Sequence, residues 1–137
     1  MDQRVVSQII EAIQQDDYVL VSNLCQTGVD LNVLSDEYQI TPLKTAIEFD
    51  NIQIALKLLE YGADPNTYYF GLTPLGQAVD LYCLMVQEDP EDNNLSMIKF
   101  LINHGASPKL LGSDGTSAID VAIAYGCQDI LDVLESI

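Results

Sequence analysis

Basic residues are scarce in this sequence. Lysine and arginine together number 5, against 21 aspartates and glutamates, and the formal net charge is −16. Such a chain repels nucleic acid and anionic membranes, and we expect it to bind neither. It attracts cationic surfaces and meets them faster. The same charge could serve only to keep a small protein in solution, and composition does not separate these two readings.

The sequence also lacks long hydrophobic runs. No apolar stretch approaches the roughly 18 residues that would span a membrane. The start, MDQRVVSQIIEAIQQDD, has one basic residue, no long apolar segment and no small-residue cleavage site, so it does not resemble a signal peptide. We therefore expect a cytoplasmic protein. Its 137 residues, 48% of them hydrophobic, suit one compact domain covering residues 1–137.

Cysteine and histidine are too few and too scattered for familiar reactive sites. Cys25, Cys83 and Cys127 form no CxxC pair, which argues against a zinc site or a disulfide framework and favours free, mostly buried thiols. The one histidine, His104, precedes Gly105 at a predicted helix C-terminus, where its role would be structural. No phosphate loop or HExxH motif is present, so we expect neither an enzyme nor a cofactor nor a metal site.

What the sequence does have is an internal repeat. TPLKTA at residues 41–46 returns as TPLGQA at residues 73–78. Glycines at similar turns give a second landmark, since Gly62 follows Gly28 by 34 residues and Gly105 follows Gly62 by 43. Two independent landmarks in one register indicate repeated structural units.

Each unit predicts two short helices. Thr41 can cap the first helix, and Pro42 suits its first position because no N–H is needed there. Apolar residues at helical spacing follow, and Asp50-Asn51 ends that helix. Gly62 is placed to terminate the second helix in a left-handed conformation. A small residue would let the helices of adjacent units approach closely, and the same position holds Ala12, Ala46, Ala78 and Ala122.

These motifs resemble the ankyrin repeat, whose pattern is Thr-Pro-Leu, a helix with small residues, a second helix ending in Leu-Leu, and Gly-Ala-Asp-x-Asn. The resemblance implies an all-α solenoid of stacked helix-turn-helix units joined by short turns. It covers about four units, 3–35, 36–69, 70–112 and 113–137, of which the first and last are degenerate, as terminal repeats are expected to be. Lys44, Gly76 and Asp120 stand where the family usually has histidine.

The third unit is about nine residues too long, and we place the insertion near residues 86–95. Its apolar start predicts an extension of the first helix, its acidic part a loop, and Ser96 a cap for the next helix. The spacing of the loop carboxylates does not fit an EF-hand, and Pro90 interrupts it, so we expect no calcium site. The loop would be either a solvated linker or a contact to a partner.

The resemblance implies a non-enzymatic protein-binding module that uses a concave face of turn tips and first helices. Positions that vary in the family, together with the acidic insertion, give a set that mixes aromatic side chains with carboxylates, both suited to an interface with a basic protein. The predicted contact residues are Glu37, Tyr38, Ile40, Glu48, Phe49, Tyr69, Phe70, Leu72, Asp80, Leu81, Glu88, Asp89, Glu91, Asp92, Asp114 and Tyr125.

Three consecutive aromatics, Tyr68, Tyr69 and Phe70, fall at a predicted turn tip. Contact with a partner and packing against neighbouring turns are both open for Tyr69 and Phe70, whereas packing is favoured for Tyr68.

The sharpest functional hypothesis is a monomeric immunity protein that covers the basic site of a bacterial nuclease-type toxin, because an acidic cover neutralises such a site and profits from electrostatic steering. The alternative is a general ankyrin scaffold, adaptor or effector that binds a non-nuclease protein. A mimic of DNA, with carboxylates at phosphate-like spacing, is a third option.

Overall fold

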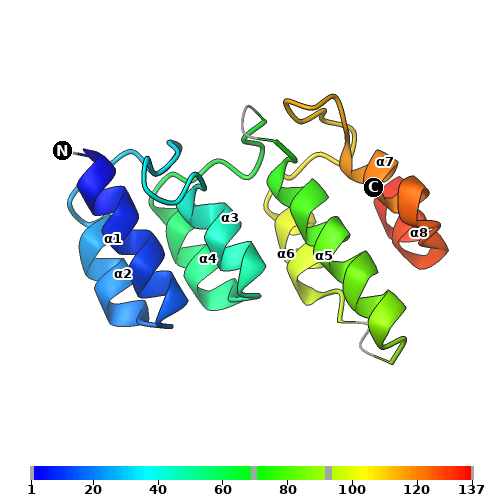
Figure 1. Ribbon diagram of the computed structural model, residues 1–137, viewed down its shortest axis with the longest axis horizontal. Coiled ribbons are helices and arrows are strands. Elements are labelled where there is room, and N and C mark those ends of the chain that lie inside the picture. Colours follow the sequence, from blue (N-terminus) through cyan, green and yellow to red (C-terminus); the bar gives the residue numbers. More distant parts are fainter. Residues whose placement is uncertain (1, 69–70, 92–93, 137) are drawn as a thin grey trace. The chain divides into compact units, whose positions relative to one another are not determined.

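The computed structural model describes residues 2–68, 71–91 and 94–136, and within these ranges the chain is all-α. This confirms the predicted fold class. Eight helices and no strand occur in the described part, and the helices follow one another as four pairs (Figure 1). No helix in these ranges is long and apolar enough to cross a membrane. The helices are α1 (Asp2–Gln14), α2 (Tyr18–Cys25), α3 (Pro42–Glu48), α4 (Ile52–Glu60), α5 (Pro74–Glu88), α6 (Ser96–Asn103), α7 (Ala118–Tyr125) and α8 (Gln128–Glu135).

The chain divides into two compact units, Met1–Asp64 and Pro65–Ile137, each with two helix pairs. In the first unit α1 packs against α2 and α3, and α4 packs against α2 and α3, so the first helices form one layer and the second helices another (Figure 1). In the second unit α5 packs against α6 and α7, and α7 packs against α8. The grouping of all four pairs into one domain stays a prediction.

The first helices of the last three pairs begin with side-chain caps, as the sequence predicts at Thr41. The side chain of Thr41 accepts from Lys44 N at 3.3 Å, and that of Thr73 accepts from Gly76 N at 3.0 Å. Ser117 accepts from Asp120 N at 3.1 Å, while the Asp120 carboxylate accepts from Ser117 N at 3.0 Å. Asp120, which replaces the usual histidine, therefore completes a capping box and strengthens the start of α7.

The turn between paired helices explains why α5 is long. In three pairs a left-handed residue ends the first helix: Asp16, Asp50 and Gly126 have φ values of 56°, 53° and 68°. The equivalent residue of the third pair is Tyr82, which is helical and buried, and α5 continues through it to Glu88. An aromatic residue tolerates the left-handed conformation poorly and gains by burial, so the helix extends in place of turning.

The asparagine that ends the Gly-Ala-Asp-x-Asn motif bonds to the backbone of the next such turn along the chain. Asn32 donates to Gly62 O at 3.0 Å and accepts from Asp64 N at 2.7 Å. Asn66 repeats this in the second unit, donating to Gly105 O at 2.9 Å and accepting from Ser107 N at 2.8 Å. The amide fits because it supplies both a donor and an acceptor from one side chain.

The core follows the repeat. The four alanines at the shared small position are all buried, and the larger buried side chains include Ile9, Ile13, Ile54, Leu58 and Leu101. Cys25 and Cys83 are buried and Cys127 is half-buried, all as free thiols, as the sequence predicts.

One capping prediction is wrong. Ser96 is the first helical residue of α6, not its cap, and the N-cap, Leu95, makes no side-chain hydrogen bond. Asn94 Oδ1 accepts from Ser96 N at 2.9 Å, so a turn centred on the asparagine side chain starts the helix one step earlier than the serine could.

Candidate functional site

The predicted contact residues of the first unit lie on α3 and the turn that precedes it. Glu37, Tyr38 and Ile40 belong to the turn, and Glu48 and Phe49 end α3. Glu37, Glu48 and Phe49 are exposed, whereas Tyr38 and Ile40 are half-buried. Because α3 packs against α1, residues of α1 that the sequence did not single out join this surface.

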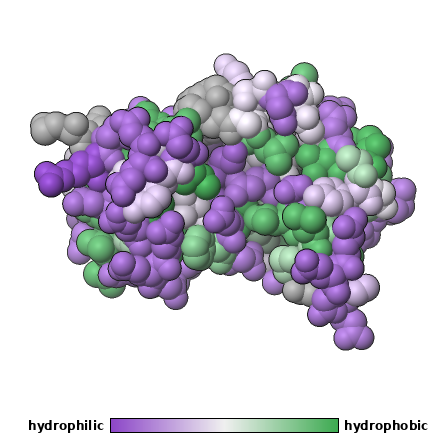
Figure 2. All heavy atoms as spheres, viewed as in Figure 1, coloured by the Kyte–Doolittle hydropathy of each residue, from purple (hydrophilic) through white to green (hydrophobic). Residues whose placement is uncertain are grey.

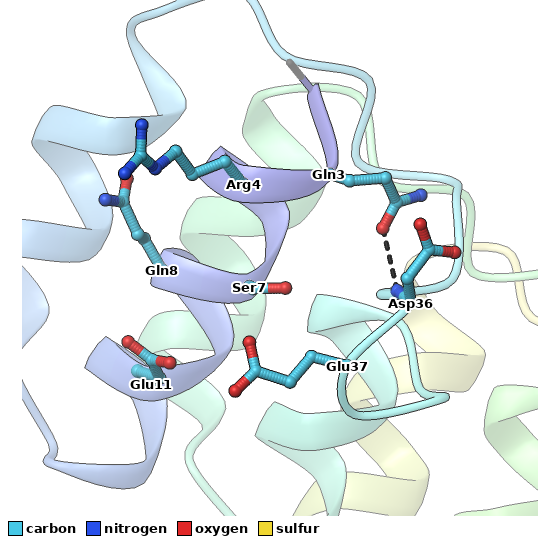
Figure 3. A pocket seen from close by; sticks show the side chains of 7 residues that line it. All are labelled: Gln3, Arg4, Ser7, Gln8, Glu11, Asp36 and Glu37. Carbon is cyan, nitrogen blue, oxygen red and sulfur yellow. Dashed lines mark hydrogen bonds between the residues drawn. The ribbon is translucent and has the colours of Figure 1, made fainter.

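A hollow of about 400 Å³ lies between α1 and the turn before α3 (Figure 3). Glu37 reaches from the turn toward α1, where Ser7 and Glu11 lie, and Arg4 and Gln8 turn away from it (Figure 3). Under the rim, the hydroxyls of Ser7 and Ser35 share a 2.7 Å hydrogen bond. The lining residues are Gln3, Arg4, Ser7, Gln8, Glu11, Asp36 and Glu37, so carboxylates outnumber the single basic side chain.

Tyr38 is tied to the edge of this hollow. Its hydroxyl donates to Glu11 Oε2 at 2.6 Å. That hydrogen bond, followed by burial and the negative charges of Glu11 and Glu37, raises the pKa of Tyr38 to about 12. The hydroxyl therefore holds the Glu11 carboxylate in place. The sequence analysis did not identify Glu11 as a contact residue. Its position next to Ala12, the small residue shared by the repeats, nevertheless places it on a first helix.

A second hollow, of about 470 Å³, lies where α1 and α3 end. Phe49 lines it and is 47% exposed, beside the carboxylates of Asp16 and Asp50. Asp16 Oδ1 accepts from Asn51 Nδ2 at 2.9 Å, which joins the two interhelical turns. The described lining contains no lysine or arginine: Ile13, Gln14, Asp16, Phe49, Asp50, Asn51, Ile52 and Gln53.

In the second unit the structure brings Asp80 and Tyr125 together. The Tyr125 hydroxyl donates to Asp80 Oδ1 at 2.8 Å, which links α7 to α5 and raises the pKa of Tyr125. Leu72 and Leu81 are half-buried. Asp114 is exposed in the loop before α7, where its carboxylate accepts from Thr116 N at 3.1 Å.

The end of α5 carries exposed apolar side chains that the prediction did not include. Leu84 is 43% exposed and Met85 is 42% exposed. The acidic residues Glu88, Asp89 and Glu91 follow, all exposed. Figure 2 shows hydrophobic side chains exposed among hydrophilic ones over this part of the molecule. The sequence indicated this feature through the apolar stretch of residues 81–86. That stretch continues beyond the position in the repeat at which α3 ends.

Three predicted contact residues, Tyr69, Phe70 and Asp92, lie outside the described residues. Tyr68, which precedes Tyr69, was expected to pack against neighbouring turns, and its side chain is 54% exposed, so it is not buried there. Thr67, the preceding residue, is buried.

His104 is held by contacts with its own helix. His104 Nδ1 lies 2.8 Å from Phe100 O, and the two rings are 4.4 Å apart, so this side chain is engaged at the end of α6. Among the residues that the structure describes, no three His, Cys, Asp or Glu side chains are grouped to hold a metal ion.

Several curated proteins resemble this chain. A putative ankyrin repeat protein of fowlpox virus is 32% identical over 125 residues, which cover 85% of this chain and 19% of that protein. The human ankyrin repeat and MYND domain-containing protein 1 is 33% identical over 113 residues, 78% of this chain and 12% of that protein. The mouse 2-5A-dependent ribonuclease is 38% identical over 60 residues, 44% of this chain and 8% of the ribonuclease.

A comparison with models of known protein families found no match. The chain spans between 8% and 19% of the length of the three relatives described, so the likeness concerns a small part of each. The capped helix pairs, the left-handed glycines and the asparagine links between pairs agree with these names. The chain belongs to the ankyrin-repeat family.

Proposed function

We propose that this chain is a protein-binding module whose acidic surface in the first unit binds a basic protein. That surface consists of Asp16, Asp36, Glu37, Glu48, Phe49 and Asp50. Membership of the ankyrin-repeat family supports the coarser statement, a protein-binding module. The observation that supports a basic partner is the hollow beside Phe49. There an exposed aromatic ring lies among carboxylates, and the described lining has no basic side chain.

The chemistry of this surface suits lysine and arginine side chains. A guanidinium or ammonium group can lie over the face of Phe49 and donate hydrogen bonds to a neighbouring carboxylate. An aromatic ring that is half exposed in the free protein gains by burial against a partner, and aromatic residues often dominate interface energies. The net charge of −16 would also steer a basic partner toward the chain.

The partner we propose is a nuclease-type toxin of bacteria, which makes this chain an immunity protein. A nuclease must present basic side chains to phosphates, so its active site is the cationic surface that an acidic partner would cover. In this role the chain needs no catalytic residue or cofactor. We propose that it acts in the cytoplasm as a monomer that pairs with the toxin.

A second candidate function is a scaffold or adaptor for a non-nuclease protein. The exposed Leu84 and Met85 at the end of α5 favour it, because two adjacent apolar side chains can anchor a partner without charge.

The test is a binding panel. The 137-residue chain is titrated by calorimetry against several basic bacterial nuclease domains and against acidic proteins of similar size, and the activity of each nuclease is measured with and without the chain. We expect tight binding and inhibition for at least one nuclease and none for the acidic proteins. Failure to bind or inhibit any nuclease, or equal binding to the acidic proteins, overturns the proposal.

A further inference from the structure

Two cysteine side chains of the second unit meet where α5 passes the start of α8. Cys83 lies on α5 and is fully buried, and Cys127 is half-buried at the N-cap of α8. Cys127 makes no side-chain capping hydrogen bond, unlike Asp17 and Asn51 at the equivalent position of the first two pairs. Burial, and next a hydrogen bond with Cys127, raise the pKa of the Cys83 thiol.

Hydrogen bonds on both sides of these cysteines fix their placement. The Tyr82 hydroxyl donates to Asp129 Oδ2 at 2.7 Å, and the Tyr125 hydroxyl donates to Asp80 Oδ1 at 2.8 Å. Residue 82 immediately precedes Cys83 and residue 80 lies three positions before it, while residues 125 and 129 lie two positions on either side of Cys127. The two cysteines are therefore held between two contacts that join the same helices.

The first unit shows that this position reaches across to the neighbouring pair. Asn51 holds the place in the repeat that Cys127 holds, and Asp16 holds the place of Tyr82. Asn51 Nδ2 donates to Asp16 Oδ1 at 2.9 Å. A side chain at the start of a second helix thus reaches the first helix of the preceding pair where that helix ends or, in α5, the equivalent Tyr82, which is the residue before Cys83.

We propose that Cys83 and Cys127 form a disulfide when the protein meets hydrogen peroxide, which makes this pair an oxidation site. Cys127 reacts first because it is the more accessible thiol. Its thiolate attacks one peroxide oxygen, the O–O bond breaks, hydroxide leaves, and a sulfenic acid forms. The Cys83 sulfur then attacks the Cys127 sulfur, the S–O bond breaks, and water leaves with the proton of Cys83. The two thiols lose two electrons, and the peroxide is reduced to two waters.

The disulfide would tie the first helix of the third pair to the second helix of the fourth. It closes a long loop, which removes freedom from the unfolded chain and raises the unfolding temperature. Cys25 lies in the other compact unit and keeps its thiol. The proposal concerns the second unit and stands whether or not the chain binds a nuclease.

The experiment uses the full chain treated with hydrogen peroxide, unfolded, and labelled with a maleimide. We expect the number of labelled thiols to fall from three to one, with a mass lower by about 2 Da before labelling. Peptide mapping should find Cys83 joined to Cys127, and dithiothreitol should restore all three thiols.

Variants separate this pair from other outcomes. Cys25→Ala should still lose two thiols, whereas Cys127→Ser should lose none to a disulfide and should show no rise in unfolding temperature after peroxide. Because Cys127 is half-buried, its serine variant is the one least prone to misfold. A disulfide that includes Cys25, a link between two chains, or a Cys127 oxidised to sulfinic acid while Cys83 is still labelled would overturn the proposal.

Discussion

The hydroxyl of Tyr38 donates to Glu11 Oε2 at 2.6 Å, which joins the turn before α3 to α1. Two further tyrosines repeat this relationship in the second unit, Tyr82 with Asp129 and Tyr125 with Asp80. Each bond connects one helix pair to the next within a unit. Part of the unusual acidity therefore serves the stacking of repeats, because Glu11, Asp80 and Asp129 each accept a tyrosine hydroxyl.

Replacing Tyr38 by phenylalanine should lower stability in a pH-dependent way. The pKa of Tyr38 is raised to about 12 in the folded chain, from an ordinary value of 10.0. A raised pKa means that the stabilisation is complete below pH 10 and is lost as pH climbs toward 12. Urea unfolding at increasing pH should show Tyr38→Phe less stable than the parent near neutrality, with the difference shrinking in alkali.

The matched control is Tyr61→Phe, at an exposed ring beyond α4. The difference in stability between Tyr61→Phe and the parent should be small and should not shrink with rising pH as that of Tyr38→Phe does. A constant difference between Tyr38→Phe and the parent across the alkaline range would show that the hydroxyl bond to Glu11 is not the cause.

The repeat also predicts unequal effects at equivalent positions. Ile13 and Ile123 hold the same place in their helices, but Ile13 is 1% exposed and Ile123 is 59% exposed. Ile13→Ala should cost about 2–5 kcal/mol of unfolding free energy, because it leaves a cavity. Ile123→Ala should change it by less than about 0.5 kcal/mol. Chemical denaturation measures both, and equal losses would mean that Ile123 is buried in solution.

Helix capping gives another pair of variants. Ser117→Ala removes the acceptor for Asp120 N and should cost about 1 kcal/mol. Ser96→Ala, at the exposed first residue of α6, should leave stability nearly unchanged. A larger loss for Ser96→Ala than for Ser117→Ala would contradict the assignment of the caps.

Much of the fold was predictable because the repeat contains recognisable helix-capping and helix-ending residues. Thr41, Thr73 and Ser117 are followed by helices as expected, and Gly62 has the expected left-handed φ of 101°. The extension of α5 followed from one apolar stretch. The start of α6 was misplaced because an asparagine and a serine two residues apart can both begin a helix, and local pattern alone does not rank them.

The site was less predictable. Family positions identified exposed residues such as Glu48 and Phe49, since these depend only on register. They could not show that the hydroxyls of Tyr38 and Tyr125 would donate hydrogen bonds to carboxylates of a neighbouring helix. Nor could they include Glu11, Leu84 or Met85, whose importance comes from how the helices pack and where α5 ends.

Phe49 should matter for binding and not for folding. For a nuclease that the chain inhibits, Phe49→Ala should weaken binding by about tenfold or more, because an exposed aromatic anchor is lost. Its unfolding free energy should stay close to that of the parent, since the ring is 47% exposed. Val19→Ala, at a 67% exposed residue of α2, is the control and should bind normally. A loss of stability without a loss of affinity would assign Phe49 to the core.

The most direct test of the account is the association rate of the chain with such a nuclease as salt is added. Stopped-flow measurements from about 0.02 M to 0.5 M sodium chloride should show the rate falling by at least about tenfold, because salt screens the attraction. Glu37→Gln combined with Glu48→Gln should make the fall shallower. A rate that does not change with salt, or a slope that the double variant leaves as it was, would contradict the claim that this acidic surface receives a basic partner.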